Sequence, residues 1–270
     1  MSKKVVILGA AGRMGQSLIR CILEKKIDGL DLIGAIDLWD ADNLGKDVGE
    51  TLGLEKCNIN LTSDLNAIGS QSDVIIDFSS HVSTSGNAER IALWNTAWVI
   101  GTTGLNNNEL NVINETSKST PIVISGNMSL GINILCDVIE STAKVLKNKG
   151  YDIEICEKHH NQKKDAPSGT ALMLGESVAS GYKIDLEKSK VDGRSGLIGE
   201  RKESEIGFHA IRGGDIIGDH SVLFAGTGET LEFTHRATDR NVFALGALEA
   251  AKWITKQNPG IYKMKDVLGL

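Results

Sequence analysis

The first half of the chain alternates short, continuously apolar runs with segments whose apolar residues recur at helical spacing. Such runs suit strands buried on both faces of a parallel sheet, and amphipathic segments suit the helices that cover it. The predicted strands are 5–8, 30–37, 73–79, 97–100 and 121–124, and the predicted helices are 16–26, 84–97 and 105–119. This alternation predicts an α/β fold with a doubly wound, parallel sheet.

The pattern changes after about Ser129. A long amphipathic helix is expected first, followed by a strand in which apolar and polar residues alternate, and then by a second helix. These elements are predicted over 131–148, 151–160 and 171–180. Residues 205–238 contain three or four strand-like runs joined by glycine turns, which is typical of antiparallel pairing.

A last helix is predicted over residues 242–257, and we expect it to pack back on the first domain. We therefore expect an N-terminal α/β domain over 1–129, joined by the C-terminal segment 241–270. An α+β domain would occupy residues 130–240. No proline-rich linker separates the two, so hinge-like connections are expected near residues 129 and 240.

Composition and charge narrow the classes of function. Hydrophobic residues make up 41% of the 270 residues and charged residues 24%, as in ordinary globular proteins. The net charge of −6 argues against nucleic acid as the main partner, because phosphate contacts need a basic surface. No apolar run approaches the ~18 residues of a membrane span, and the N-terminus does not resemble a signal peptide. We expect a cytoplasmic protein without membrane contact.

The four cysteines are Cys21, Cys57, Cys136 and Cys156, and they are widely spaced. They form neither a CxxC pair nor a Cys/His zinc pattern, so no metal site is expected. Free thiols in a reducing compartment are the simplest interpretation.

The first predicted strand runs directly into a glycine-rich turn, VVILGAAGRMG, with Gly9, Gly12 and Gly15 spaced GxxGxxG. Glycines let the backbone approach a pyrophosphate, and the start of the following helix offers unpaired N–H groups with a partial positive charge. Arg13 adds a full charge there. A tight turn without a ligand is the alternative, but the first strand of a dinucleotide-binding fold carries its fingerprint here.

Asp37 ends the second predicted strand, 22 positions after Gly15. An acid at about this distance is expected to accept hydrogen bonds from the adenosine ribose of a nicotinamide dinucleotide. Residues 38–40 include no arginine or lysine that could neutralise the 2′-phosphate of NADPH. We therefore expect a preference for NADH without exclusion of NADPH, for which Arg13 could offer a compensating charge.

Two further glycine turns, GTTG at 101–104 and SGNMS at 125–129, follow the predicted strands 97–100 and 121–124. In an open parallel sheet, ligands lie outside the carboxyl ends of the strands. Each turn alone is weak support for a site. Together they predict the rim of one crevice, at the nicotinamide half of the cofactor.

The stretch EKHHNQKKDAPSGTA, residues 157–171, concentrates two of the six histidines beside a lysine cluster. His159 and His160 end a strand, where adjacent side chains point to opposite faces, and Lys163 follows closely. Ser168-Gly169-Thr170 would begin a helix, either as an ordinary N-cap or as a binding site for a carboxylate or phosphate. The combination predicts an anionic substrate that exchanges a proton during the reaction.

Other classes of function remain open on the residues alone. An amino-acid dehydrogenase or a semialdehyde dehydrogenase could share the fold, but the latter needs a reactive cysteine. Cys136 lies in a helical pattern and Cys156 in a strand pattern, which favours neither as a nucleophile. A non-catalytic dinucleotide sensor would keep the glycine turn but would not need Lys163 or the Ser-Gly-Thr helix start.

The motifs GAAGRMG, IGTTG, GNMSLGIN, EKHHNQKKDAPSGTA and the terminal KMKDVLGL closely resemble the 4-hydroxy-tetrahydrodipicolinate reductase (dihydrodipicolinate reductase) family. The resemblance covers nearly the whole chain. It implies an N-terminal Rossmann domain and a C-terminal α+β domain that binds substrate and forms a homotetramer. It also implies NAD(P)H-dependent reduction of a cyclic dicarboxylate in lysine and diaminopimelate biosynthesis.

The resemblance also assigns residues. His159 and Lys163 correspond to the catalytic pair, and His160, Ser168, Gly169 and Thr170 to substrate ligands. The corresponding cofactor contacts are Gly9, Ala10, Ala11, Gly12, Arg13, Met14, Asp37, Gly101, Thr102, Thr103, Ser125, Gly126, Asn127 and Met128. The segment DFSSHVST lacks the proline and the basic residue that often follow DFS or DFT in the family.

Overall fold

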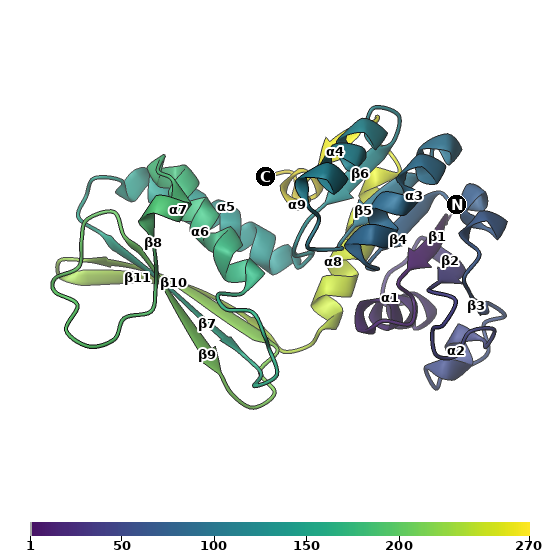
Figure 1. The fold of residues 1–270 in the computed structure, drawn as a ribbon, viewed down its shortest axis with the longest axis horizontal. Coiled ribbons are helices and arrows are strands. Elements are labelled where there is room, and N and C mark those ends of the chain that lie inside the picture. The colour runs from purple at the N-terminus through teal and green to yellow at the C-terminus, as the bar shows by residue number, and fades with distance from the viewer. Residues whose placement is uncertain (1) are drawn as a thin grey trace. The chain divides into compact units, whose positions relative to one another are not determined.

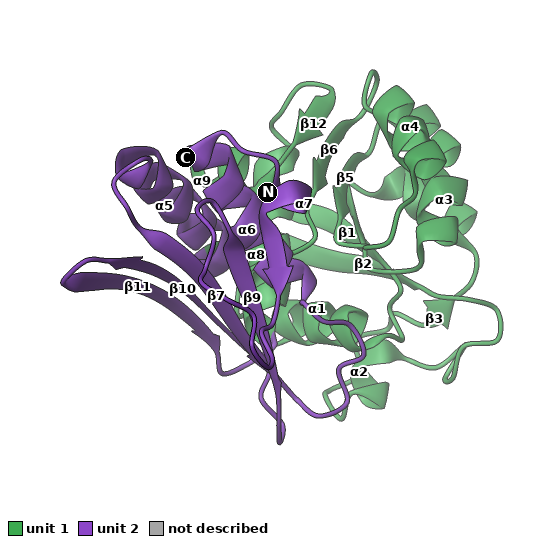
Figure 2. Cartoon of the chain, turned by 60° about the vertical axis from the view of Figure 1, so that its left-hand side comes forward, with its two compact units in different colours: residues 1–130, 241–270 green, residues 131–240 purple. Residues whose placement is uncertain are grey.

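The computed structural model describes residues 2–270, which divide into two units (Figure 1, Figure 2). Unit 1 contains the chain up to Leu130 together with Asn241–Leu270, and unit 2 contains Gly131–Arg240. Unit 1 is therefore discontinuous in sequence, since the chain leaves it and returns to it.

A seven-stranded parallel sheet forms the centre of unit 1, in the order β3-β2-β1-β4-β5-β6-β12. This order is that of a dinucleotide-binding fold, and the predicted parallel sheet is confirmed. The edge strands β3 and β12 have no counterpart among the predicted strands. The strands are β1 Lys3–Leu8, β2 Leu30–Ile36, β3 Leu61–Thr62, β4 Val74–Asp77, β5 Ala97–Ile100, β6 Pro121–Ile124 and β12 Gly260–Tyr262.

Helices cover both faces of this sheet, because its strands are apolar on both sides. Val5 and Ile7 of β1 join a core with α1 and α8, and Val6 and Leu8 join a second core with α3 and α4. The helices are α1 Arg13–Leu23, α2 Val48–Thr51, α3 His81–Trp94, α4 Asn107–Thr116, α8 Asn241–Ile254 and α9 Met264–Leu268, with short 3₁₀ turns at Leu65–Ala67 and Gly69–Gln71. The last long helix, α8, thus belongs to unit 1.

Unit 2 has a five-stranded sheet in the order β11-β10-β7-β9-β8, with helices on one face (Figure 1). Its core joins apolar residues of that face to α5 and α6. The strands are β7 Asp152–His159, β8 Lys190–Asp192, β9 Ile206–Arg212, β10 Gly218–Gly226 and β11 Glu229–Ala237, and the helices are α5 Leu130–Leu146, α6 Gly169–Tyr182 and α7 Leu186–Ser189.

The expected antiparallel character of this sheet is only half right. β10 pairs antiparallel with β7 and β11, but β9 pairs parallel with both β7 and β8. The reason is that β7 takes the central position and separates β9 from β10. The glycine turn between β9 and β10 therefore does not close a hairpin, and the sheet is mixed.

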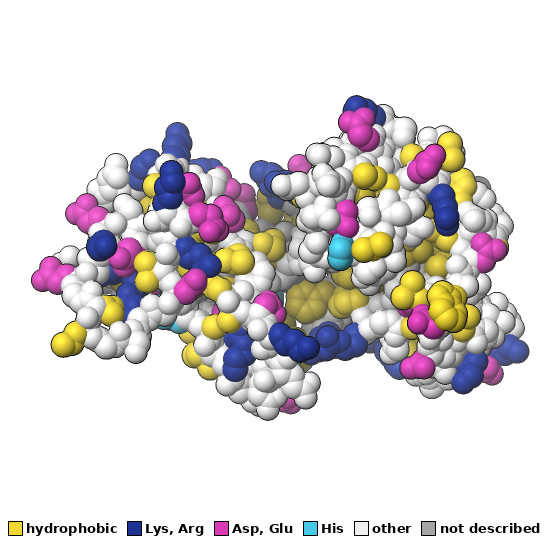
Figure 3. Space-filling model, in the orientation of Figure 1, with side chains coloured by type: hydrophobic (Ala, Val, Ile, Leu, Met, Phe, Trp, Pro, Cys, Tyr) yellow, Lys and Arg dark blue, Asp and Glu magenta, His cyan; other side chains and the backbone are white. Residues whose placement is uncertain are grey.

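The surface is mixed in charge. On the faces visible in Figure 3, basic and acidic side chains are interspersed over each unit, in keeping with a net charge of only −6. Among residues 2–270, no helix combines the length and the apolar character needed to cross a membrane.

Candidate active site

The glycine turn after β1 forms a tight backbone cradle. Gly9 has a φ of +75°, and a Cβ there would lie 2.4 Å from the carbonyl oxygen of Phe78, so a larger residue would strain the turn and collide with backbone. Gly12 is the N-cap residue of α1 and has no side chain that could accept a hydrogen bond from the first N–H groups of the helix. The N–H of Ala11 donates to Oδ2 of Asp37 across 2.7 Å, which ties the turn to the end of β2.

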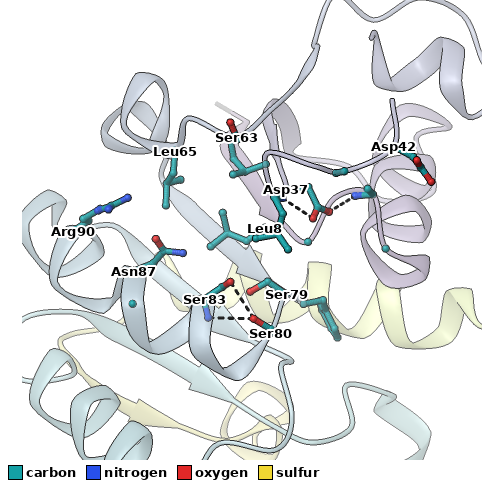
Figure 4. A pocket seen from close by; sticks show the side chains of 18 residues that line it. Leu8, Asp37, Asp42, Ser63, Leu65, Ser79, Ser80, Ser83, Asn87 and Arg90 are labelled. Atoms are coloured by element: carbon teal, nitrogen blue, oxygen red, sulfur yellow. Dashed lines mark hydrogen bonds between the residues drawn. The ribbon is translucent and has the colours of Figure 1, made fainter. Parts of the chain in front are cut away.

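A cavity of about 690 Å³ opens beside this turn (Figure 4). Its volume lies in the range of small-molecule and cofactor sites, roughly 300–1,000 Å³. Asp37 lies on one side, and the side chains of Asn87 and Arg90 extend from α3 on the opposite side, with Ser63 and Leu65 between (Figure 4). Gly9, Ala11, Gly12 and Asp37, which belong to the expected cofactor contacts, thus line one cavity.

The other expected cofactor residues do not line this cavity. Arg13 is exposed and Met14 half-buried at the start of α1, and Ala10 is buried. Gly101, Thr102 and Thr103 follow β5, and Ser125, Gly126, Asn127 and Met128 follow β6. All of them succeed the carboxyl ends of parallel strands, so the sheet brings them to the edge that carries Gly9 and Asp37.

Asp77, the last residue of β4, organises the turns at this edge. Its Oδ1 accepts hydrogen bonds from the Ser79 N–H at 3.0 Å, the Ser79 hydroxyl at 2.6 Å and the Thr102 hydroxyl at 3.1 Å. The side chain is fully buried, and Oδ2 has no partner among residues 2–270. Burial raises the pKa of this carboxyl group, although the hydrogen bonds oppose the rise.

The histidine stretch of unit 2 is built around a buried carboxylate, Glu157. Both nitrogens of the Arg212 fork reach it at 2.7 Å, and Nδ1 of His159 lies 2.6 Å from Oε2. The N–H of Ser168 donates to Oε1 at 3.1 Å. Glu157 and His159 are two residues apart on β7, so both face the same side of the sheet.

The hydrogen bond to Glu157 fixes the state of the His159 ring. Burial opposes the ionisation of Glu157, but the bonds from Arg212 and His159 outweigh it and hold its pKa below the ordinary value. Because an ionised carboxylate only accepts, the proton of the neutral His159 ring lies on Nδ1, and Nε2 is left as an acceptor. Burial, aided by the nearby charges of Lys163 and Arg212, lowers the pKa of His159, although Glu157 opposes this shift.

Gly218 lies beside Nε2 of His159. A Cβ at Gly218 would lie 3.1 Å from Nε2, so a larger residue would crowd this nitrogen. The ring of His220 packs edge-on against His159, with ring centres 5.1 Å apart. Burial and the neighbouring His159 lower the pKa of His220 to about 3, so it contributes no charge at neutral pH.

The helix start at Ser168 proves to be an N-cap. The Ser168 hydroxyl accepts from the Ala171 N–H at 3.2 Å and lies 3.0 Å from Nε2 of His220. Ser168 is buried, whereas Gly169 is exposed and Thr170 half-buried at the first turn of α6. The first-turn N–H groups of a helix lack intrahelical partners and suit an anion.

Two expected residues lie on the loop between His159 and this helix. The Nζ of Lys163 lies 2.9 Å from Oδ1 of Asp165, and its side chain is largely buried. The backbone oxygen of Asp165 accepts from Arg212 at 2.8 Å, which anchors the loop to β9. His160 is half-buried and directly follows His159, the last residue of β7.

Two residues of this cluster, Glu157 and Arg212, were missing from the expected site. Extending the alternation of Ile153 and Ile155 by two steps places Glu157 and His159 on the same inward face, which is a signal for Glu157. Arg212 lies 55 positions farther along the chain and gives no local signal.

The cysteines give no support to a thiol-based reaction. Burial raises the pKa of Cys136, which lies half-buried in α5, and burial also raises the pKa of Cys156 in β7. A raised pKa disfavours the thiolate, which is the nucleophilic form.

Comparisons with known proteins cover both units. Family models described as dihydrodipicolinate reductase, N-terminus, and dihydrodipicolinate reductase, C-terminus, match residues 3–128 and 131–268. A 4-hydroxy-tetrahydrodipicolinate reductase of Rhodopseudomonas palustris (strain TIE-1) is 45% identical over 267 residues, covering 99% of this chain and 97% of the relative. One of Alkalilimnicola ehrlichii (strain MLHE-1) is 44% identical over the full length of both proteins.

A solved structure shows the same fold. The dipicolinate-bound dihydrodipicolinate reductase from Paenisporosarcina sp. TG-14 has a TM-score of 0.76 and 21% identity, and the match covers 97% of this chain and 98% of the other. Both family models match in order, and a relative is 45% identical over nearly the full chain. This chain therefore belongs to the dihydrodipicolinate reductase family.

Proposed function

We propose that this protein reduces 4-hydroxy-tetrahydrodipicolinate to tetrahydrodipicolinate with loss of water, as a step of lysine and diaminopimelate biosynthesis. Its relatives carry the name of this reductase across nearly the whole chain. The observation on the molecule that best supports the proposal is the His159–Glu157–Arg212 cluster beside the start of α6. It combines a proton-exchanging ring with positions suited to a carboxylate.

The residues of unit 1 fit a nicotinamide dinucleotide, which supplies a hydride when bound. The cradle at Gly9 has no room for a side chain, and Asp37 lines the cavity that follows it. Each oxygen of Asp37 accepts one backbone N–H, from Ala11 and from Leu38, which orients the carboxylate for ribose hydroxyls. We propose that NADH is preferred and NADPH accepted, because a 2′-phosphate would bring like charge close to Asp37.

In the proposed roles, His159 and Lys163 handle protons, because loss of the hydroxyl group as water requires an acid. The neutral His159 ring takes up a proton from water at Nε2, Glu157 stabilises the charged ring through Nδ1, and the charged ring then gives this proton to the substrate. A substrate with two carboxylates favours this protonation, since it places negative charge beside the ring. Lys163 would assist loss of the hydroxyl.

The substrate carboxylates would be held by His160 and by the first turn of α6 at Gly169 and Thr170. Ser168 would act mainly through its N-cap, because its hydroxyl is already engaged by Ala171 and His220. Dipicolinate, which the Paenisporosarcina protein binds, is a cyclic dicarboxylate like the proposed substrate.

The reaction can be followed by the absorbance of the reduced nicotinamide after addition of 4-hydroxy-tetrahydrodipicolinate. We expect His159→Gln and Lys163→Ala to lower kcat by about 10²–10⁴, the range of positioned acid–base groups. Lys164→Ala, one residue further along and exposed, is the matched control and should stay close to wild type. Wild-type turnover in both site variants would contradict the assigned roles.

We further propose that unit 2 forms a homotetramer through its sheet. The face of the sheet opposite α5 and α6 carries Cys156, Ile211 and Leu223, and Ile211 is 47% exposed. Light scattering should give four times the mass of the chain. Ile211→Asp should lower that mass, and an unchanged assembly would mean that this face is not the interface.

A further inference from the structure

We propose that Arg90 admits the 2′-phosphate of NADPH and so sets how strongly this protein discriminates between its two cofactors. This inference rests on the proposed use of both cofactors and names the residue that governs the choice between them. It starts from the distribution of charge around the cavity beside Asp37.

Helix α3 turns a polar stripe toward that cavity. Ser83, Gly86, Asn87 and Arg90 all line it, and their spacing of three and four residues places them on one face of the helix. Gly86 has open space where a Cβ would be, so the wall recedes between Ser83 and Arg90. One end of the stripe, at Ser83, lies next to Ser80, and Arg90 lies at its other end (Figure 4).

The cavity is lined by more acidic than basic side chains. Asp37 and Asp42 are its acids, and Arg90 is the single arginine or lysine among the residues that line it. Arg13, the cation nearest in sequence to the glycine turn, does not line it. Arg90 makes no ion pair with any residue from 2 to 270, so its guanidinium is available to a ligand.

The two cofactors differ only at the ribose 2′ position, as a hydroxyl or a phosphate. Asp37 favours the hydroxyl, which can donate to it. A phosphate needs a cation, and the planar fork of an arginine matches its oxygens in a bidentate arrangement. Arg90 projects from the wall opposite Asp37 on a long, exposed side chain, so it can approach the phosphate without displacing Asp37 (Figure 4).

The test measures binding of NADH and NADPH separately, by calorimetric titration without the dicarboxylate. We expect Arg90→Gln to weaken NADPH binding about tenfold or more, the loss expected when a charge-assisted contact is removed, with NADH binding nearly unchanged. NADPH binding by wild type should weaken more steeply with added salt than binding by Arg90→Gln, because exposed charges are screened.

Lys118→Gln is the matched control, because it removes one positive charge from an exposed site in unit 1 that does not line the cavity. Its ratio of NADPH to NADH affinity should equal that of wild type. Equal loss of both cofactors in Arg90→Gln, no loss of either, or the same change in Lys118→Gln would overturn the proposal. Binding needs no turnover, so failure of the reductase assay would leave this result standing.

Discussion

Removal of the Arg212 guanidinium should destabilise unit 2 in a pH-dependent way. Arg212→Met keeps an unbranched, apolar stem but removes the guanidinium, and it deletes two hydrogen bonds of 2.7 Å to Glu157. The Glu157 side chain is only 1% exposed, so water cannot replace the lost partner. The Nδ1 of His159 and the N–H of Ser168 would remain as its donors.

The size of the effect follows from the burial of the pair. Removing one partner of a buried ion pair costs roughly 3–5 kcal/mol, because the other charge stays buried. Two donors remain to Glu157 and methionine keeps the packing of the aliphatic stem, so we expect the lower end of this range, about 3 kcal/mol. For a protein of this size, that lowers the Tm by roughly 6–12 °C.

The pH dependence distinguishes this cause from lost packing. In wild type the pKa of Glu157 lies below 4.5, so its stabilisation is complete above 4.5 and is lost as the pH falls below it. Without Arg212, burial would raise that pKa, and the folded variant would gain stability as the pH falls through the raised value. The difference in unfolding free energy should therefore shrink between about pH 7 and about pH 5.

Urea unfolding followed by circular dichroism at both pH values measures this difference. Arg236→Met is the control, because Arg236 is 68% exposed and lies 3.7 Å from Asp219. Exposed pairs of this kind contribute about 0–1 kcal/mol. A loss in Arg212→Met no larger than in the control, or equal at both pH values, would refute the reasoning.

Three further outcomes are expected. A Cβ at Gly246 would lie 1.8 Å from the Met128 carbonyl oxygen, so Gly246→Ala should lower the free energy of unfolding by roughly 1–3 kcal/mol or more, as measured by thermal unfolding. In the control Gly86→Ala the added Cβ meets no atom, so the stability should stay the same or rise. Hydrogen bonds from Arg194 and His209 overcome the effect of burial and lower the pKa of Glu154 to about 2. Ionised Glu154 therefore stabilises the wild type above pH 4.5, and this stability is lost as the pH falls toward 2. Glu154→Gln should lack this contribution, which acid titration of the unfolding free energy measures. Thr170→Val should weaken the dicarboxylate more than the cofactor, and equal losses in titrations would identify Thr170 as purely structural.

Continuous apolar runs predicted the central strands of the first sheet, but they did not predict its edge strands. Strands such as β4 and β5 are four residues long and buried throughout, which no loop would be. β3 has two residues and β12 three, too few for any period to emerge. The parallel pairing of β9 escaped for another reason, since alternation of side chains is the same in parallel and antiparallel strands.

The candidate site gives a sequence signal where its residues are close in the chain. His159 ends β7 and Ser168 caps α6, so one short loop joins them, and local chemistry pointed to both. Only folding reveals the neighbours of Arg212 and Arg90, since β9 brings one beside Glu157 and α3 turns the other toward the cavity. A charged residue on a surface helix or strand end looks like any solvated side chain until its neighbours are known.

The return of the chain to unit 1 has a consequence for synthesis on the ribosome. Helix α8 supplies Ala244, Ala247, Leu248 and Ile254 to the first core, and β12 closes the edge beside β6. The N-terminal part emerges first but cannot complete its core until α8 and β12 are made. Unit 2, continuous from 131 to 240, has all of its residues earlier. The nascent chain should therefore finish folding in the reverse of its order of synthesis, and an early stop codon before α8 should spare unit 2 while leaving unit 1 open to proteolysis.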